Sequence, residues 1–189
     1  MALPTEPSDA TPDIETLSTR TVYENAWMRV REDAIRRRDG STGIYGVVDK
    51  TDFVVVVPLH ADGSLHLVQQ FRYPVSARFW EFPQGMWGPP GTDPALAAAH
   101  ELQEETGLTA TTLTHAGFLY EAYGTINQGY DIFLATGLTA GEAAPETEEQ
   151  DLISRAFPRA AFERMLLDGT IKDATTVAVF GLLRLKGLL

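Results

Sequence analysis

The chain has no cysteine among its 189 residues. Disulfide frameworks, thiolate nucleophiles and cysteine-ligated zinc sites are therefore excluded, which fits a cytoplasmic protein. No stretch approaches the ~18 consecutive apolar residues of a membrane span. The N-terminus also lacks the basic start and apolar core of a signal peptide. We therefore expect neither export nor membrane insertion.

Positive charge is scarce. The sequence has 15 lysines and arginines against 26 aspartates and glutamates, a formal net charge of -11. No basic patch of the kind that phosphate backbones require is present, so nucleic acid is excluded as the main partner. An acidic protein also exerts no general attraction on a polyanion, so a polyanionic ligand would need a bound metal ion.

The hydrophobic content of 44% is sufficient for the core of one domain with a tail. Residues 1–18 are rich in proline, threonine, serine and acid, and predict a disordered leader. We expect an N-terminal β region over 19–50 and the main domain over 51–189.

Hydrophobic patterning predicts alternating strands and helices. Residues 53–59 are continuously apolar, as in a strand buried on both faces. We predict strands at 21–23, 28–35, 43–48, 52–59, 65–73 and 152–157, a hairpin turn at 61–64, and helices at 94–106, 158–167 and 174–185. Strands enclosed by helices indicate an α/β fold.

The most informative segment is the predicted helix over 94–106. It places Glu101, Glu104 and Glu105 within about 100° of its circumference. Like charges at i and i+4 destabilise a helix by about 0.2–0.5 kcal/mol, and a hard divalent cation would turn this repulsion into coordination. The alternative is an ordinary solvated acidic face, because glutamate is a good helix former.

The helix termini and its small residues support a packed helix. Thr92 or Asp93 can cap it, Pro94 suits its first turn, and Gly107 suits the left-handed position after its end. A stripe of alanines beside the glutamates indicates close packing on the rest of the fold. We therefore expect the acidic edge to face a cleft.

Residues 81–85, Glu-Phe-Pro-Gln-Gly, are followed by a Gly/Pro-rich loop and then by residues 100–108, His-Glu-Leu-Gln-Glu-Glu-Thr-Gly-Leu. Together they resemble a Nudix box. That motif ends in Arg-Glu, an aliphatic residue, any residue, Glu-Glu, any residue, Gly and an aliphatic residue. The chain departs from it at His100, which replaces the arginine, at Thr92, which replaces an early glutamate, and at Gly85, which lies one residue too far upstream.

The resemblance extends over residues 20–189 to the ADP-ribose pyrophosphatase-like branch of the family. It implies a Nudix α/β/α sandwich with a mixed sheet, preceded by an N-terminal antiparallel sheet. In that branch the N-terminal sheet exchanges between subunits, so a homodimer is expected. It also implies Mg²⁺ as the cofactor, with Mn²⁺ as an alternative.

The resemblance assigns roles to individual residues. It implies that Arg72 and Glu81 contact substrate, and that Glu105 is catalytic as well as a metal ligand. His100 takes the place of the arginine that orients a catalytic glutamate, and can do so only weakly or when protonated. The implied metal ligands are the Gln84 carbonyl, Glu101, Glu104 and Glu105.

Tyr123 bears on substrate choice. In the resembled branch a proline near this position accompanies ADP-ribose, and a tyrosine accompanies dinucleoside polyphosphates. The side chain could stack on an adenine. Alternatively, Tyr120 and Tyr123 pack under the loop.

The acidic run over 146–151 holds a further candidate. The resemblance implies that Glu148 or Glu149 serves as catalytic base or extra metal contact. The alternative is a solvated loop, as most acidic runs are.

The tryptophans, and the histidines other than His100, fit no motif. We read Trp27, Trp80 and Trp87 as interface, base-stacking or core residues. The scattered histidines are interpreted as structural: His60, His66 and His115.

The sequence thus predicts a Mg²⁺-dependent hydrolase of the pyrophosphate bond in nucleoside diphosphate derivatives, ADP-ribose or a related sugar nucleotide. One alternative is a dinucleoside polyphosphate hydrolase. The other is a catalytically weak nucleotide sensor, which the changes at His100 and Thr92 favour.

Overall fold

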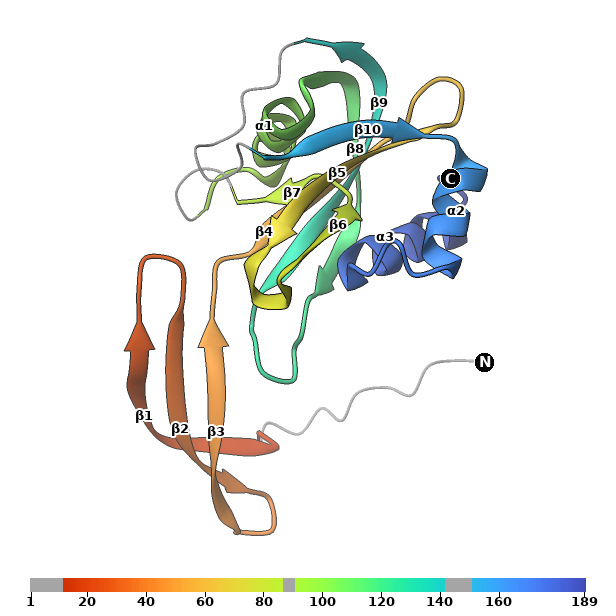
Figure 1. Cartoon of the computed structure of the whole chain (residues 1–189). Coiled ribbons are helices and arrows are strands. Elements are labelled where there is room, and N and C mark those ends of the chain that lie inside the picture. The colour runs from red at the N-terminus through yellow and green to blue at the C-terminus, as the bar shows by residue number, and fades with distance from the viewer. Residues whose placement is uncertain (1–11, 87–90, 142–150) are drawn as a thin grey trace. The chain divides into compact units, whose positions relative to one another are not determined.

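The computed structural model describes residues 12–86, 91–141 and 151–189. The chain forms two units, which we call the N-terminal unit, Met1–Lys50 with Ala122–Asn127, and the main unit, Thr51–Glu121 with Gln128–Leu189. Figure 1 shows the strands of the N-terminal unit in red to light orange, and the main unit in colours from light orange at β4 to blue at the C-terminus.

The N-terminal unit is a three-stranded antiparallel sheet. Its strands, in the order β1-β2-β3, are β1 (Ile14–Glu24), β2 (Arg29–Arg37) and β3 (Thr42–Asp49). The prediction of disorder was therefore wrong for residues 14–18. Pairing from Ile14 opposite Arg37 onward, with an ion pair of 2.9 Å between Glu15 and Arg36, extends a segment whose composition alone suggests a tail.

The loop over 122–127 joins two strands of the main unit but is bound to β3. Val48 N–H donates to the Thr125 carbonyl at 2.9 Å, and Asn127 N–H donates to the Val48 carbonyl at 3.2 Å. The Tyr45 hydroxyl donates to the Gly124 carbonyl at 2.8 Å. These contacts place the loop in the N-terminal unit.

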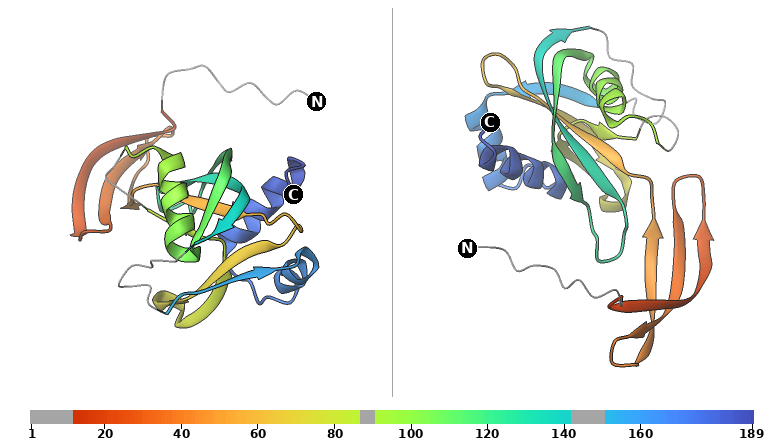
Figure 2. Two further views of the ribbon diagram at one scale, coloured as in Figure 1. Left: turned by 90° about the horizontal axis from the view of Figure 1, so that it is seen from above. Right: turned by 180° about the vertical axis from the view of Figure 1, so that it is seen from behind.

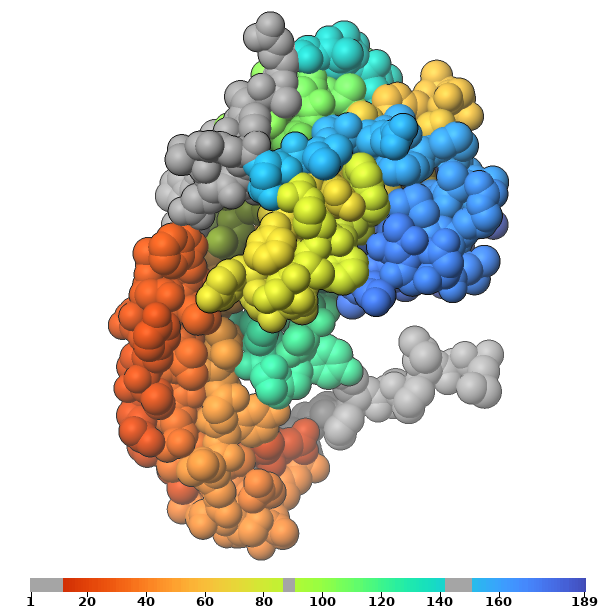
Figure 3. Space-filling view, viewed as in Figure 1, coloured from red at the N-terminus to blue at the C-terminus, as the bar shows by residue number. Residues whose placement is uncertain are grey.

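The described residues of the main unit form two sheets. The first is mixed, with the order β7-β4-β9-β8 and a parallel β4–β9 pair. Its strands are β4 (Phe53–Pro58), β7 (Gln84–Gly85), β8 (Leu108–Tyr120) and β9 (Gly129–Ala140). The second is antiparallel, in the order β10-β5-β6, and consists of β5 (Leu65–Arg72), β6 (Ala77–Glu81) and β10 (Ile153–Phe157). The short helix η1 (Tyr73–Val75) connects β5 to β6, and in Figure 3 these yellow segments lie between β10 and the C-terminal helices.

In the described part of the chain, three α-helices cover these sheets: α1 (Pro94–Thr106), α2 (Arg159–Leu167) and α3 (Ala174–Leu185). The Asp93 side chain caps α1 by accepting from Ala95 N–H at 2.9 Å, which decides between the two predicted caps. Gly107 ends α1 with φ +70°, a conformation that glycine adopts without strain. The α1 and α3 boundaries confirm the prediction. Among the described residues, no helix combines the length and hydropathy that crossing a membrane requires.

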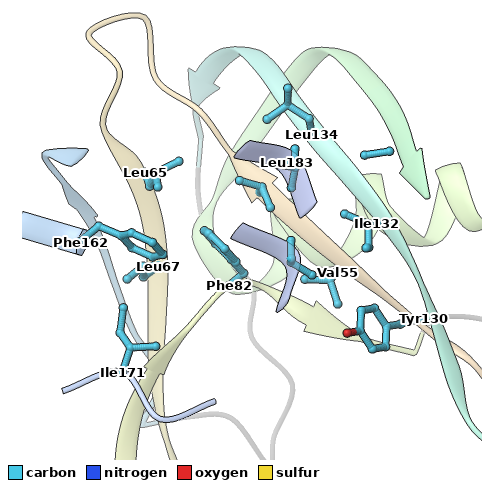
Figure 4. Close-up of a cluster of buried hydrophobic side chains, with 13 residues drawn as sticks. Val55, Leu65, Leu67, Phe82, Tyr130, Ile132, Leu134, Phe162, Ile171 and Leu183 are labelled. Carbon is cyan, nitrogen blue, oxygen red and sulfur yellow. The ribbon is translucent and has the colours of Figure 1, made fainter. Parts of the chain in front are cut away.

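The core has two parts because β4 and β9 are buried on both faces. Val55 and Val57 face the second sheet, α2 and α3, in a cluster built around Phe82 and Phe162 (Figure 4). Val54 and Val56 face the opposite way, toward the alanines of α1. The views in Figure 2 show α1 on one face of the mixed sheet and α3 on the other. The predicted α/β/α sandwich and the doubly buried strand are confirmed.

The tryptophans differ in their surroundings. Trp80 packs edge to face on Phe157, with ring centroids 4.8 Å apart, at the margin of the core. Trp27 is exposed in the N-terminal unit. Trp87 lies outside the described residues.

Candidate active site

The acidic edge of α1 is buried against the fold. Glu101 is 6% exposed and Glu105 only 1%, while Glu104 is partly buried. On the neighbouring face, Ala98 and Leu102 pack into the core cluster shared with β4 and β9. This packing contradicts the alternative of a solvated acidic face. Burial of the two carboxylates of Glu101 and Glu105 is unfavourable unless cations or hydrogen-bond donors compensate their charge.

Strand β7 supplies one such donor and lies directly against α1. The Gln84 N–H donates to Glu105 Oε2 at 3.1 Å. At Gly85 a Cβ atom would lie 2.6 Å from Glu101 Oε2, so any larger residue would force this carboxylate to shift. The pairing of Gly85 with Val54 and of Gln84 with Val55 fixes β7 in this position. The one-residue displacement of Gly85 from the motif therefore still brings a glycine to the glutamates.

His100 joins two of the glutamates. Ligand atoms of His100, Glu101 and Glu104 all lie within 4.8 Å of one another, and His100 Nδ1 is 2.9 Å from Glu104 Oε2. Two carboxylates and an imidazole at this spacing suit a divalent cation. The absence of a Cβ atom at Gly85 leaves room for the Glu101 carboxylate of this group. These residues therefore could hold the metal that the acidic helix predicts.

A second charged group lies on β5 and β6. Glu81 is 2% exposed and forms an ion pair with Arg72, whose Nε donates at 3.3 Å, and it accepts from Gln70 Nε2 at 3.1 Å. Burial raises the pKa of Glu81; the Arg72 guanidinium opposes this effect and Asp173 adds to it. Arg72 is partly exposed, so part of its guanidinium is accessible to a ligand while Glu81 holds its position.

The segment over 81–85 connects the two groups. The Phe82 N–H donates to Thr176 Oγ1 on α3 at 2.9 Å, and the Pro83 carbonyl accepts from Val56 N–H on β4 at 2.9 Å. The segment is therefore held on both sides between Glu81, bound to Arg72, and Gln84, bound to Glu105. The Glu-Phe-Pro-Gln-Gly motif indicates that this segment belongs to the site, but it does not predict these hydrogen-bond partners.

Some polar residues near this segment have no counterpart in the sequence motif. The buried Tyr130 has a pKa raised by burial and by the neighbouring Asp173, against the effect of its hydrogen bond with Thr175. Asp173 also caps α3 by accepting from Thr176 N–H at 2.7 Å. The cap could be predicted from the sequence, but its proximity to Tyr130 depends on packing.

The remaining predicted site residues are dispersed or undescribed. Tyr123 is 84% exposed and belongs to the N-terminal unit, while Tyr120 is exposed and packs edge to face on Phe118. This exposure contradicts the alternative that both tyrosines pack under the loop. Glu148 and Glu149 lie outside the described residues.

The histidines other than His100 make contacts elsewhere. His66 is 3.0 Å from His60 and 2.7 Å from the Ser154 hydroxyl, and burial followed by the charge of His60 lowers its pKa to about 4. His115 Nε2 lies 2.7 Å from Asp131 Oδ1. These pairs fit the structural interpretation of the three residues.

Comparisons with known proteins found related sequences and a related structure. Residues 14–48 match the family model for a nucleoside diphosphate sugar hydrolase N-terminal domain, and residues 50–179 match the model for the NUDIX domain. The chain is 33% identical over 167 residues to the ADP-ribose pyrophosphatase of Mycobacterium tuberculosis, covering 88% of this chain and 81% of that one. It is 26% identical over 139 residues to the ADP-ribose pyrophosphatase of Bacillus subtilis, covering 74% and 75%. A crystal structure of an ADP compounds hydrolase superposes with a TM-score of 0.82 at 24% identity, covering 96% of this chain and 98% of that one.

Proposed function

Since the chain belongs to the Nudix family and is a pyrophosphohydrolase, we propose that it hydrolyses the pyrophosphate bond of ADP-ribose or a related sugar nucleotide with a divalent cation. The observation that carries this proposal is the buried acidic edge of α1, which lies against Gly85 and the Gln84 amide. Two relatives named ADP-ribose pyrophosphatase support the substrate class. The match to a nucleoside diphosphate sugar hydrolase N-terminal domain supports it further.

One group of residues is suited to bind the metal ion, and another to bind the diphosphate of the substrate. Glu101 and Glu104, with Glu105 and the Gln84 carbonyl, would hold the cation. Mg²⁺ is the expected ion and Mn²⁺ the alternative. When bound, such an ion neutralises phosphate charge and lowers the pKa of a water molecule. Arg72, held by Glu81 and itself partly exposed, offers a guanidinium to the diphosphate.

The reaction is a substitution at phosphorus. The oxygen of water forms a bond to one phosphorus, and the bond from that phosphorus to the bridging oxygen breaks. The products of ADP-ribose or a sugar nucleotide are two phosphomonoesters. We propose Glu148 or Glu149 as the base that accepts the proton of water. Neither residue lies among those the structure describes, so this role depends on the resemblance alone.

The test is turnover of ADP-ribose, other sugar nucleotides and diadenosine polyphosphates with Mg²⁺, measured as phosphate released from the phosphomonoester products by alkaline phosphatase. Glu105→Gln should lower kcat by at least about 100-fold, because it removes a charge from the metal site while keeping the side-chain shape. Gln103→Glu is the matched control, since it adds an acid on the exposed side of the same helix. Equal activity in Glu105→Gln and the parent protein would refute the metal assignment. Binding without turnover of any compound would favour the sensor.

We also propose a homodimer formed through the N-terminal sheet. This unit exposes the large apolar side chains Val22, Tyr23, Trp27 and Ile44, and a second copy would cover them. Light scattering of the full chain should give twice the mass of one subunit. A monomer at micromolar concentration would refute the dimer.

A further inference from the structure

His100 occupies the place where the Nudix motif has arginine, and its Nδ1 lies 2.9 Å from Glu104 Oε2. We infer that His100 is itself a ligand of the divalent cation and moves the metal preference of this chain away from Mg²⁺, toward transition metals such as Mn²⁺ and Co²⁺. The inference rests on the metal site of the proposed function. It adds a ligand and a preference that the motif does not provide.

The spacing of the donor atoms supports coordination. Adjacent ligands of an octahedral ion with metal–ligand distances of about 2.1 Å lie roughly 3.0 Å apart. The 2.9 Å between His100 Nδ1 and Glu104 Oε2 matches that separation. Glu101 belongs to the same group, whose ligand atoms lie within 4.8 Å of one another.

The positions of these residues on α1 explain their convergence. Residues at i and i+4 share one face of a helix, so His100 and Glu104 lie one turn apart and side by side. Glu101 is the next residue along, and the glycine at position 85 leaves room for its carboxylate. The helix therefore presents one nitrogen and two carboxylates on one edge.

The chemistry of the replacement gives the direction of the change. An arginine guanidinium has no acceptor and stays protonated, so it cannot ligate a cation. A neutral imidazole offers a nitrogen lone pair, which transition metals bind more strongly than Mg²⁺ does. Affinity for such sites rises from Mn²⁺ to Co²⁺, whereas Mg²⁺ prefers oxygen ligands.

The alternative is that His100 only positions Glu104 through a hydrogen bond. Pulsed EPR of the full-length protein with bound Mn²⁺ distinguishes the two, because a ligating imidazole couples its nitrogen-14 nucleus to the metal electrons. We expect this coupling in the parent protein and its loss in His100→Gln and His100→Arg. His115→Gln is the matched control, since His115 contacts Asp131 on another strand, and it should keep the coupling.

Calorimetric titration tests the preference independently. In His100→Arg the ratio of the Kd for Mg²⁺ to the Kd for Co²⁺ should fall by about 10-fold, a typical effect of disturbing a metal site. Circular dichroism of each variant checks that the fold is kept.

Two failures are distinguishable. If Mn²⁺ binds, is lost in Glu101→Gln and shows no nitrogen coupling, His100 is not a ligand, and the metal site of the proposed function stands. If Mn²⁺ fails to bind, or binds equally in Glu101→Gln, the α1 metal site falls and the inference falls with it. A nitrogen signal that persists in His100→Gln would come from another histidine, such as the His60–His66 pair, and would also overturn the inference.

Discussion

Glu81 shows how a single buried carboxyl links stability to function. It is almost fully buried beside Arg72 and Gln70, and burial outweighs the arginine so that its pKa is raised from 4.5. A raised pKa means that the folded state binds the proton more tightly than the unfolded state does. Its favourable contribution is therefore complete below pH 4.5 and is lost as the pH rises through the folded-state pKa. The Glu81 carboxyl therefore contributes less to the stability of the fold at neutral pH than at acid pH.

This sign gives a prediction for Glu81→Gln. The variant should melt at a higher temperature than the parent at pH 7, because it buries no charge, and the difference should shrink as the pH falls through the raised folded-state pKa toward 4.5. Its kcat/KM should fall, because a neutral amide holds Arg72 less firmly. Thermal unfolding across pH, together with kinetics, tests both effects. A lower melting temperature at pH 7 would show that the ion pair outweighs the burial. Glu15→Gln, at an exposed ion pair, is the control and should change the stability little.

At the scale of elements, the site depends on one short strand approaching one helix. Strand β7 has only two residues, yet its backbone lies against Glu101 and its amide binds Glu105. Hydrogen bonding to β4 holds this backbone, so it cannot move aside without breaking the sheet. The geometry of the carboxylates is therefore set by strand pairing as much as by the helix.

Gly85→Ala tests this coupling. The added methyl would overlap Glu101 Oε2, so the carboxylate must move. We expect a loss of metal affinity and of kcat, and a loss of about 1–3 kcal/mol in the free energy of unfolding. Mn²⁺ titration and urea unfolding measure these effects. Gly46→Ala is the control, because a Cβ there meets nothing within 4 Å. Unchanged Mn²⁺ affinity in Gly85→Ala would separate β7 from the metal site.

At the scale of the whole molecule, the chain forms two units, and one loop between strands of the main unit belongs to the N-terminal unit. The loop over 122–127 is hydrogen-bonded to β3 and carries Tyr123. Tyr123, which the family resemblance links to substrate choice, thus belongs to the unit proposed to form the dimer. Substrate choice and assembly would then share one structural unit.

Tyr123→Pro tests whether this loop selects the substrate. Thr125 N–H donates to the Ala122 carbonyl at 2.9 Å, which makes Tyr123 the second residue of a β-turn, a position that proline favours. Stability should change by less than about 0.5 kcal/mol, because the side chain is exposed. The ratio of kcat/KM for ADP-ribose to that for diadenosine polyphosphates should rise. An unchanged ratio would exclude Tyr123 from substrate selection.

The sequence alone determined the features that depend on neighbours along the chain. A cap at Thr92 or Asp93, the turn at Gly107 and the apolar run of β4 could be predicted, because caps and periodicity are local. The motif of α1 also identified the glutamates that we propose as metal ligands. Local composition failed at residues 14–18, where strand pairing overrides it.

Only the tertiary structure decided which distant residues meet. The approach of Gly85 to Glu101, the ion pair between Arg72 and Glu81, and the binding of the 122–127 loop to β3 each join segments well separated in sequence. The 2.9 Å contact of His100 with Glu104 spans a single helical turn. The metal site proposed around this contact also needs the neighbouring carboxylates, which are buried by packing against β7 and the core. Sequence patterns record the preferences of each segment, whereas contacts between segments follow from packing the whole chain at once.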